Sequence, residues 1–108
     1  MRNDFERFRD MEEAIAKIEK YATQGKAEFF DNELIQTWIV FQLQIIGEAA
    51  RSISDETYEK YPQIEWRNII DFRNLLVHEY FRIDLKIVWK IVETEIPKLK
   101  RQVQAILK

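Results

Sequence analysis

The chain has 108 residues, of which 46% are hydrophobic and 33% charged, and its formal net charge is −2. This length suits one domain with a modest core, and the hydrophobic fraction is too high for a disordered chain. The lack of cysteine excludes disulfides and thiolate metal sites. We therefore expect a single domain over residues 1–108.

The distribution of apolar residues and of glycine and proline predicts an all-α fold. Only two glycines and two prolines are present, and alternating strand-like runs are missing. No stretch approaches the roughly 18 apolar residues of a membrane span, and the charged N-terminus lacks the apolar core of a signal peptide. We expect a soluble cytoplasmic protein with no membrane association. One histidine and no HExxH motif make a metal site or other cofactor unexpected.

The two parts of the chain carry opposite charge. Residues 1–65 hold 8 Lys/Arg against 14 Asp/Glu, and residues 66–108 hold 9 against 5. A basic C-terminal part is what an anionic substrate would require, although charges can also coat helices unevenly without functional meaning.

A first helix is predicted from Asn3 or Asp4 to Ala22. Its apolar residues recur at steps of three and four: Phe5, Phe8, Met11, Ile15, Ile18 and Ala22. Gly25 ends this helix, and residues 26–30 form a short connector, or one helical turn, whose Phe29 and Phe30 should pack inward.

The second helix is predicted over about residues 32–52, with Asp31 as its N-cap. Its apolar residues form two lines: Leu34, Trp38, Phe41 and Ile45 on one, and Ile35, Ile39 and Ile46 on the other. A helix that is apolar on two sides is central in a bundle or lines a subunit interface. Because 108 residues leave little chain to cover both sides, the pattern favours a homodimer.

Three further helices are expected. Ser54 should cap a short helix to about Lys60, which Tyr61-Pro62 ends. A helix from about Ile64 to Val77 should turn these residues inward: Trp66, Ile69, Ile70, Leu76 and Val77. After a turn, Asp84 should cap a last helix whose apolar period continues across Pro97, with a kink there or a restart capped by Thr94.

Four residues with polar side chains that could act on a phosphate lie close together in the sequence: Arg73, Asn74, His78 and Tyr80. Residues five apart on a helix differ by about 140° in direction, so Arg73 and His78 of one chain would not lie side by side. Two chains related by a two-fold axis could bring both types of side chain to one phosphate. This geometry agrees with the homodimer expected from the second helix.

These side chains suit metal-free RNA cleavage. Histidine can act as base and acid near neutrality, and the Arg73 guanidinium can stabilise charge on a phosphate attacked by an RNA 2′-hydroxyl. Asn74 could orient the phosphate or imidazole, and Tyr80 could stack on a base or donate a hydrogen bond. Structural interpretations stay open: a helix C-cap for His78, and a core or interface role for Tyr80.

Glu48 also has two interpretations. It is either a partly exposed residue at a helix end or a buried acid that holds a cation such as Arg73. Arg73 itself could pair with Glu48, Asp71 or Glu79 instead of acting in catalysis.

Two segments, Ile45-Ile46-Gly47-Glu48-Ala49-Ala50 and residues 66–80, resemble the HEPN superfamily, and within it the HepT-like ribonuclease toxins. The likeness continues through Asp84, Trp89 and Ile96-Pro97. The resemblance implies a HEPN-type bundle of about four to five helices, usually dimeric, with an RNA-cleaving cleft at the subunit interface. Arg73 and His78 would be the catalytic pair and leave a 2′,3′-cyclic phosphate, and Asn74 matches the polar residue after the arginine.

The resemblance also implies a partner and a means of control. In such toxin–antitoxin systems a minimal nucleotidyltransferase is the antitoxin, and it would attach AMP from ATP to Tyr80. The added charge would repel RNA phosphate from the cleft. The alternative is a non-catalytic HEPN accessory subunit that binds nucleotide or supports a nucleotidyltransferase.

Overall fold

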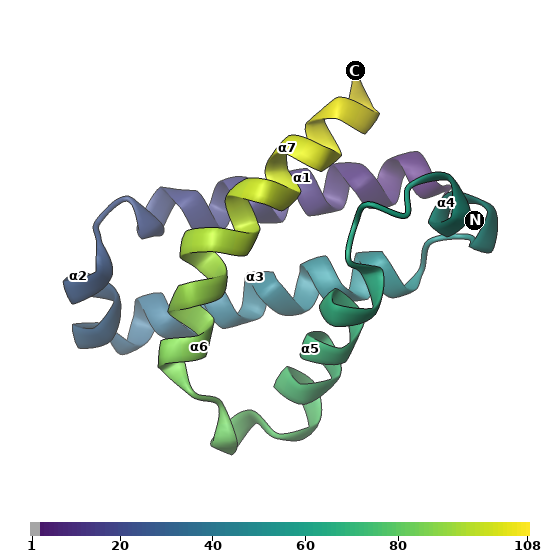
Figure 1. Ribbon diagram of the computed structural model, residues 1–108. Helices are drawn as coiled ribbons and strands as arrows, with labels where there is room; N and C mark the ends of the chain where they lie inside the picture. Colours follow the sequence, from purple (N-terminus) through teal and green to yellow (C-terminus); the bar gives the residue numbers. More distant parts are fainter. Residues whose placement is uncertain (1–2) are drawn as a thin grey trace.

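The computed structural model describes residues 3–108, so the first two residues of the expected domain lie outside it. All regular structure in that range is helical, which confirms the all-α prediction (Figure 1). The elements are α1 (Asp4–Ala22), α2 (Lys26–Asp31), α3 (Glu33–Arg51), α4 (Asp55–Lys60), α5 (Trp66–His78), the 3₁₀ turn η1 (Tyr80–Arg82), α6 (Leu85–Lys90), the π-helical η2 (Ile91–Glu95) and α7 (Ile96–Leu107).

Helices α1 and α3 form an antiparallel pair. At one end, the Asp4 carboxylate accepts hydrogen bonds of 2.6 Å from the Ser54 and Thr57 hydroxyls. Toward the other end, Trp38 Nε1 donates to the Lys17 carbonyl at 3.3 Å. These contacts hold α4 to the beginning of α1 and keep the two long helices in register.

The N-cap of α3 is Asn32, not the predicted Asp31. Helix α2 continues through Asp31, so only Asn32 has the extended backbone, with φ −127° and ψ 104°, from which a side chain can reach the first turn of α3. Its Oδ1 accepts from the backbone N–H groups of Leu34 and Ile35. The cap at Ser54 and the cap at Asp84 are as predicted.

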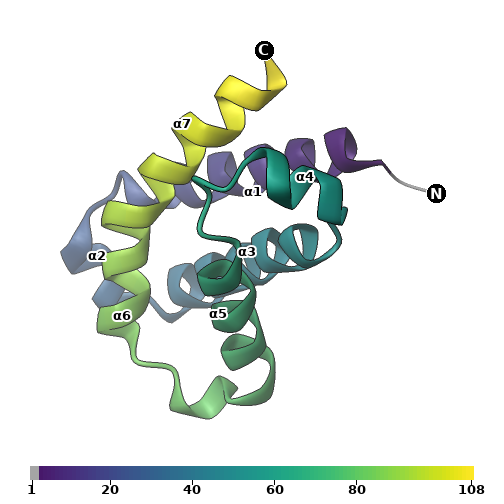
Figure 2. The same ribbon diagram turned by 45° about the vertical axis from the view of Figure 1, so that its right-hand side comes forward.

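Helix α5 packs on α3, and α7 packs on α1. As Figures 1 and 2 show, α6 and α7 form one long helical segment that crosses both α1 and α3. The core between these elements is aliphatic and aromatic, and its fully buried members include Met11, Ile15, Ile18, Phe29, Ile39, Leu76, Val88 and Val103.

The predicted kink or Thr94-capped restart near Pro97 is replaced by the π-helical segment η2. Thr94 is no cap, because its hydroxyl donates to the Lys90 carbonyl one turn earlier at 2.7 Å. Pro97 follows in the first turn of α7, where a missing backbone N–H costs little. The apolar face therefore stays in phase through Val92, Ile96 and Leu99, all buried.

Three smaller predictions were wrong. Phe29 is buried, but Phe30 is 36% exposed, because α2 has only one inward face. Val77 is exposed rather than packed inward. Helix α5 begins at Trp66, not Ile64, since a tight turn through Tyr61–Ile64 comes first and its Tyr61 carbonyl accepts from Trp66 Nε1. Within residues 3–108, no helix is long and apolar enough to cross a membrane.

Candidate active site

Gly47 allows α5 to approach α3 closely beside Arg73. A Cβ atom placed on Gly47 would lie 2.6 Å from Arg73 Cγ, well inside van der Waals contact. The absence of a side chain at Gly47 therefore lets the stem of Arg73 lie directly on the backbone of α3. The Arg73 side chain is only 16% exposed as a result.

Glu48 holds the Arg73 guanidinium in place. Arg73 Nη2 lies 2.8 Å from Glu48 Oε2, and Arg73 Nη1 donates to Asn74 Oδ1 at 3.0 Å. The Glu48 side chain is 53% exposed. Glu48 is therefore not the buried acid of the second interpretation, but it does pair with Arg73 from an exposed position near the end of α3.

A second arginine reaches the same carboxylate. Arg51 Nη1 lies 3.8 Å from Glu48 Oε2, so two guanidinium groups flank one carboxylate. The cluster keeps a net positive charge, which favours an anion such as phosphate. Arg51 was missed by the sequence analysis, although its position three residues after Glu48 on a helix is a usable signal. No role was predicted for Gly47 either, although a glycine inside an apolar helix indicates a close backbone approach.

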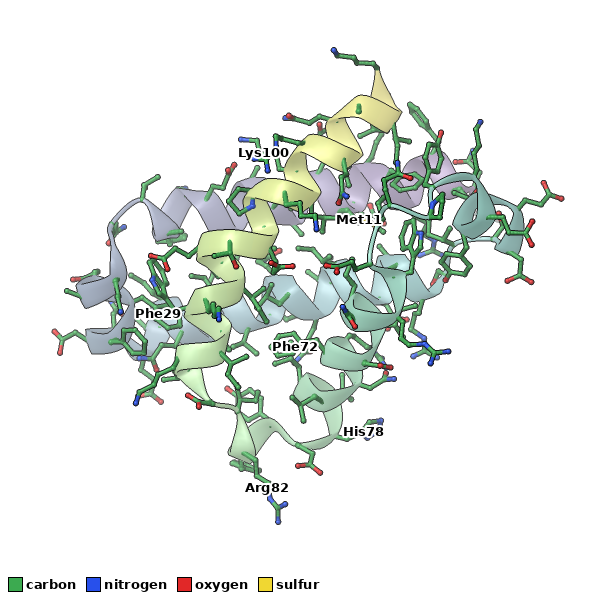
Figure 3. All side chains as sticks on the ribbon, viewed as in Figure 1. Met11, Phe29, Phe72, His78, Arg82 and Lys100 are labelled. Carbon is green, nitrogen blue, oxygen red and sulfur yellow. The ribbon has the colours of Figure 1, made fainter. Side chains whose placement is uncertain are left out.

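His78 is the last residue of α5, and its side chain is exposed. Among residues 3–108, no hydrogen bond or ion pair holds its imidazole. In Figure 3, His78 projects outward, away from the space into which Phe72 points. Arg73 is therefore held by Glu48 and Asn74, whereas no side chain among residues 3–108 holds both Arg73 and His78.

Tyr80 and Phe81 follow in η1 with their rings in edge-to-face contact, 5.7 Å apart. Tyr80 is half-exposed, and Phe81 is 99% exposed. Two accessible aromatic rings thus lie within three residues of His78, where an unpaired base could stack on them.

An exposed apolar stripe on α3 leads to the Glu48–Arg73 pair. Leu34, Trp38 and Phe41 are all exposed, with Leu34 at 81%, and half-buried Ile45 continues the line toward Glu48. The second apolar line of this helix, through Ile35, Ile39 and Ile46, is buried. The helix is therefore apolar on two sides, as predicted, and one chain covers only one of them.

A mostly apolar pocket of about 330 Å³ lies between α5 and α7, apart from the residues Arg73, Asn74, His78 and Tyr80. The walls of this pocket include Ile69, Phe72, Ile96 and Leu99. Within residues 3–108, no group of three His, Asp or Glu side chains is placed to hold a metal ion.

Comparisons with known proteins identify relatives along most of the chain. A family model described as "Ribonuclease HepT-like" matches residues 11–106. The chain is 40% identical to "Putative RNase MJ1380" of Methanocaldococcus jannaschii over 73% of this chain and 72% of that protein. It is 34% identical to "Probable ribonuclease HepT" of Thermococcus cleftensis over 92% of this chain and 91% of that protein. No solved structure matches.

Proposed function

The chain belongs to the HepT-like ribonuclease family, and from this membership we propose that it is a metal-independent endoribonuclease, the toxin of a toxin–antitoxin system. The observation that carries the proposal is the arrangement at α5. A guanidinium held by Glu48 and Asn74 lies on the same helix as an exposed histidine that has no partner among residues 3–108. A scaffold subunit would need neither feature.

The chemistry is an internal transesterification. The RNA 2′-oxygen attacks the adjacent phosphorus while His78 takes the 2′-hydroxyl proton. A bond forms between the 2′-oxygen and phosphorus, and the bond from phosphorus to the 5′-oxygen breaks. The imidazolium of the second copy's His78 gives a proton to the departing 5′-oxygen. Arg73 stabilises the charge on the equatorial oxygens, and the products are a 2′,3′-cyclic phosphate and a 5′-hydroxyl.

The cleft proposed for this reaction lies between two copies of the chain. The α3 stripe advances by four and three residues from Leu34 through Trp38 and Phe41 to Ile45, the spacing at which paired helices bury a seam. Burying this stripe against itself would place both Glu48–Arg73 pairs beside the same seam. Each half of the cleft would then supply one arginine and one histidine.

Control is proposed to act through Tyr80, with a cognate minimal nucleotidyltransferase as antitoxin. The Tyr80 phenol oxygen attacks the α-phosphorus of ATP, and pyrophosphate leaves. Tyr80 is half-exposed, and no hydrogen bond occupies its hydroxyl among residues 3–108, so an enzyme can reach it. The transferred AMP would add negative charge two residues from His78, where RNA phosphate must bind.

The test is RNA cleavage by purified wild-type protein, Arg73→Ala and His78→Ala in the presence of a chelator. The wild type should release fragments ending in cyclic phosphate, and each variant should lose at least about a hundredfold in rate. Cleavage that His78→Ala leaves unchanged would refute the catalytic assignment. Intact mass after treatment with the nucleotidyltransferase and ATP should show AMP on the wild type and none on Tyr80→Phe.

The second candidate, a non-catalytic HEPN accessory subunit, predicts a different result. In that case wild type and His78→Ala would both leave RNA intact and would bind the nucleotidyltransferase equally well. An exposed His78 on the same helix as a held guanidinium favours the ribonuclease.

A further inference from the structure

A small hollow lies beside Tyr80, between the first half of α3 and the segment that follows α5. Its volume is about 200 Å³. Its polar lining residues, Glu33, Gln36 and Thr37, come from α3. Its apolar lining includes Val40 of α3 and, from the segment after α5, Tyr80 and Ile83. Ligand pockets usually exceed about 300 Å³, so the hollow suits one planar base and not a whole nucleotide.

Two residues that line the hollow, Glu33 and Gln36, carry side-chain acceptor oxygens. Gln36 Nε2 donates to the Phe29 carbonyl at 3.0 Å and to the Phe30 carbonyl at 3.2 Å, so both of its N–H groups are used. No donor among the described residues 3–108 occupies its Oε1. Glu33 lies one helical turn earlier, and within residues 3–108 no hydrogen bond or ion pair occupies its carboxylate.

We propose that this hollow binds the guanine base adjacent to the scissile phosphate, with Glu33 as the residue that selects it; this inference rests on the proposed ribonuclease function. Guanine carries two adjacent donors, N1–H and the N2 amino group, which match a carboxylate and a neighbouring amide oxygen. Adenine and cytosine present a donor beside a ring acceptor, and uracil has one donor between two acceptors. Two acceptors in a row therefore exclude the other three bases.

The position of the hollow agrees with this assignment. Tyr80 forms one wall and can stack on the base, as aromatic side chains do in single-strand recognition. Tyr80 is two residues after His78, so their Cα atoms are at most about 7 Å apart. We therefore assign a base in the hollow to a nucleotide next to the phosphodiester bond whose cleavage His78 assists by proton transfer.

The experiment is cleavage of a short RNA library in which every position is randomised, followed by sequencing of the cut ends. Wild-type protein should cut next to guanine about tenfold or more in preference to other bases, as expected for hydrogen bonds to a charged group. Glu33→Gln should lose that preference, because its amide presents a donor beside an acceptor. Asp31→Asn, which removes the same charge two residues away and outside this hollow, should keep it.

A binding measurement separates failure of this inference from failure of the ribonuclease proposal. Guanosine and adenosine monophosphates are titrated into His78→Ala, with and without Glu33→Gln, and the Gln36 side-chain amide is followed by NMR. If the wild-type protein cuts no RNA while His78→Ala still binds guanosine monophosphate in a Glu33-dependent way, the ribonuclease is refuted and the base pocket stands. RNA cleavage without preference for guanine, equal in wild type and Glu33→Gln, would overturn the base pocket alone.

Discussion

Gly47 of α3 lies directly against Arg73 of α5, and a Cβ atom at Gly47 would come within 2.6 Å of Arg73 Cγ. Two helices that are distant in sequence therefore touch where the candidate catalytic arginine begins. The next residue, Glu48, pairs with the end of the same side chain. Gly47 and Glu48 together thus determine how closely Arg73 packs on α3 and in which direction its guanidinium points.

Gly47→Ala should destabilise the protein and abolish RNA cleavage. On helix propensity alone this substitution would stabilise α3 by about 1 kcal/mol. The clash with Arg73 opposes that gain, and overpacking of this kind typically costs about 1–3 kcal/mol. Chemical denaturation should therefore show a net loss of stability. An unfolding free energy above that of the wild type would show that α5 can move away without cost.

Glu48→Gln should reduce cleavage far more than stability. The Glu48 carboxylate is half-exposed, so loss of its charge should change the unfolding free energy by no more than about 1 kcal/mol. The rate should fall because the guanidinium loses the carboxylate that orients it. Glu19→Gln is the matched control: Glu19 pairs with Lys100 at 3.0 Å, away from the site. Equal losses of activity in the two variants would contradict a positioning role for Glu48.

Phe41→Glu should give a folded monomer that cleaves no RNA. Phe41 is exposed on the α3 stripe, so a charge there should leave the monomer stable but oppose burial against a second copy. Sedimentation and circular dichroism measure association and folding separately. Ile87→Glu changes an equally exposed apolar residue on α6, outside the stripe, and should leave the proposed dimer intact. A wild type that is monomeric at all concentrations yet cleaves RNA would refute the shared cleft.

Asp4→Asn should destabilise the junction of α1 and α4 in a pH-dependent way. Burial alone would raise the pKa of the Asp4 carboxyl, but hydrogen bonds from Ser54 and Thr57, together with the charge of Arg7, outweigh it and lower that pKa. A lowered folded-state pKa gives stability that is present above the ordinary aspartate value of about 3.9 and is lost as pH falls through the folded value.

The melting temperatures of wild type and Asp4→Asn, measured from pH 7 to pH 2, test this linkage. The wild type should melt higher at pH 7, and the difference should shrink once the pH is below about 3.9. Asp31→Asn, an exposed change on α2, is the control. A difference between Asp4→Asn and wild type that stays constant down to pH 2 would show that the ionised carboxylate is not the source of the effect.

The apolar periods and the caps determined most of the fold in advance. The stripe of α1, the two apolar lines of α3 and the caps at Ser54 and Asp84 follow from local spacing and backbone chemistry, which act within one turn of helix. The boundary errors at Asp31 and Thr94 arose where local signals compete. Asp31 is the last residue of α2 and therefore cannot cap α3. The π-helical η2 keeps the apolar face in phase, so no cap is needed at Thr94.

For the candidate site, too, the sequence determined some features and the tertiary structure determined others. The residue types at Arg73, Asn74, His78 and Tyr80 and their spacing were enough to suggest phosphate chemistry and a need for two chains. Only the tertiary structure decided that Glu48, although exposed, holds Arg73, and that Gly47 lets α5 lie against α3. It also placed Glu33 and Gln36 beside Tyr80, more than 40 residues along the chain. Such contacts depend on how whole helices pack, and no local period in the sequence contains that information.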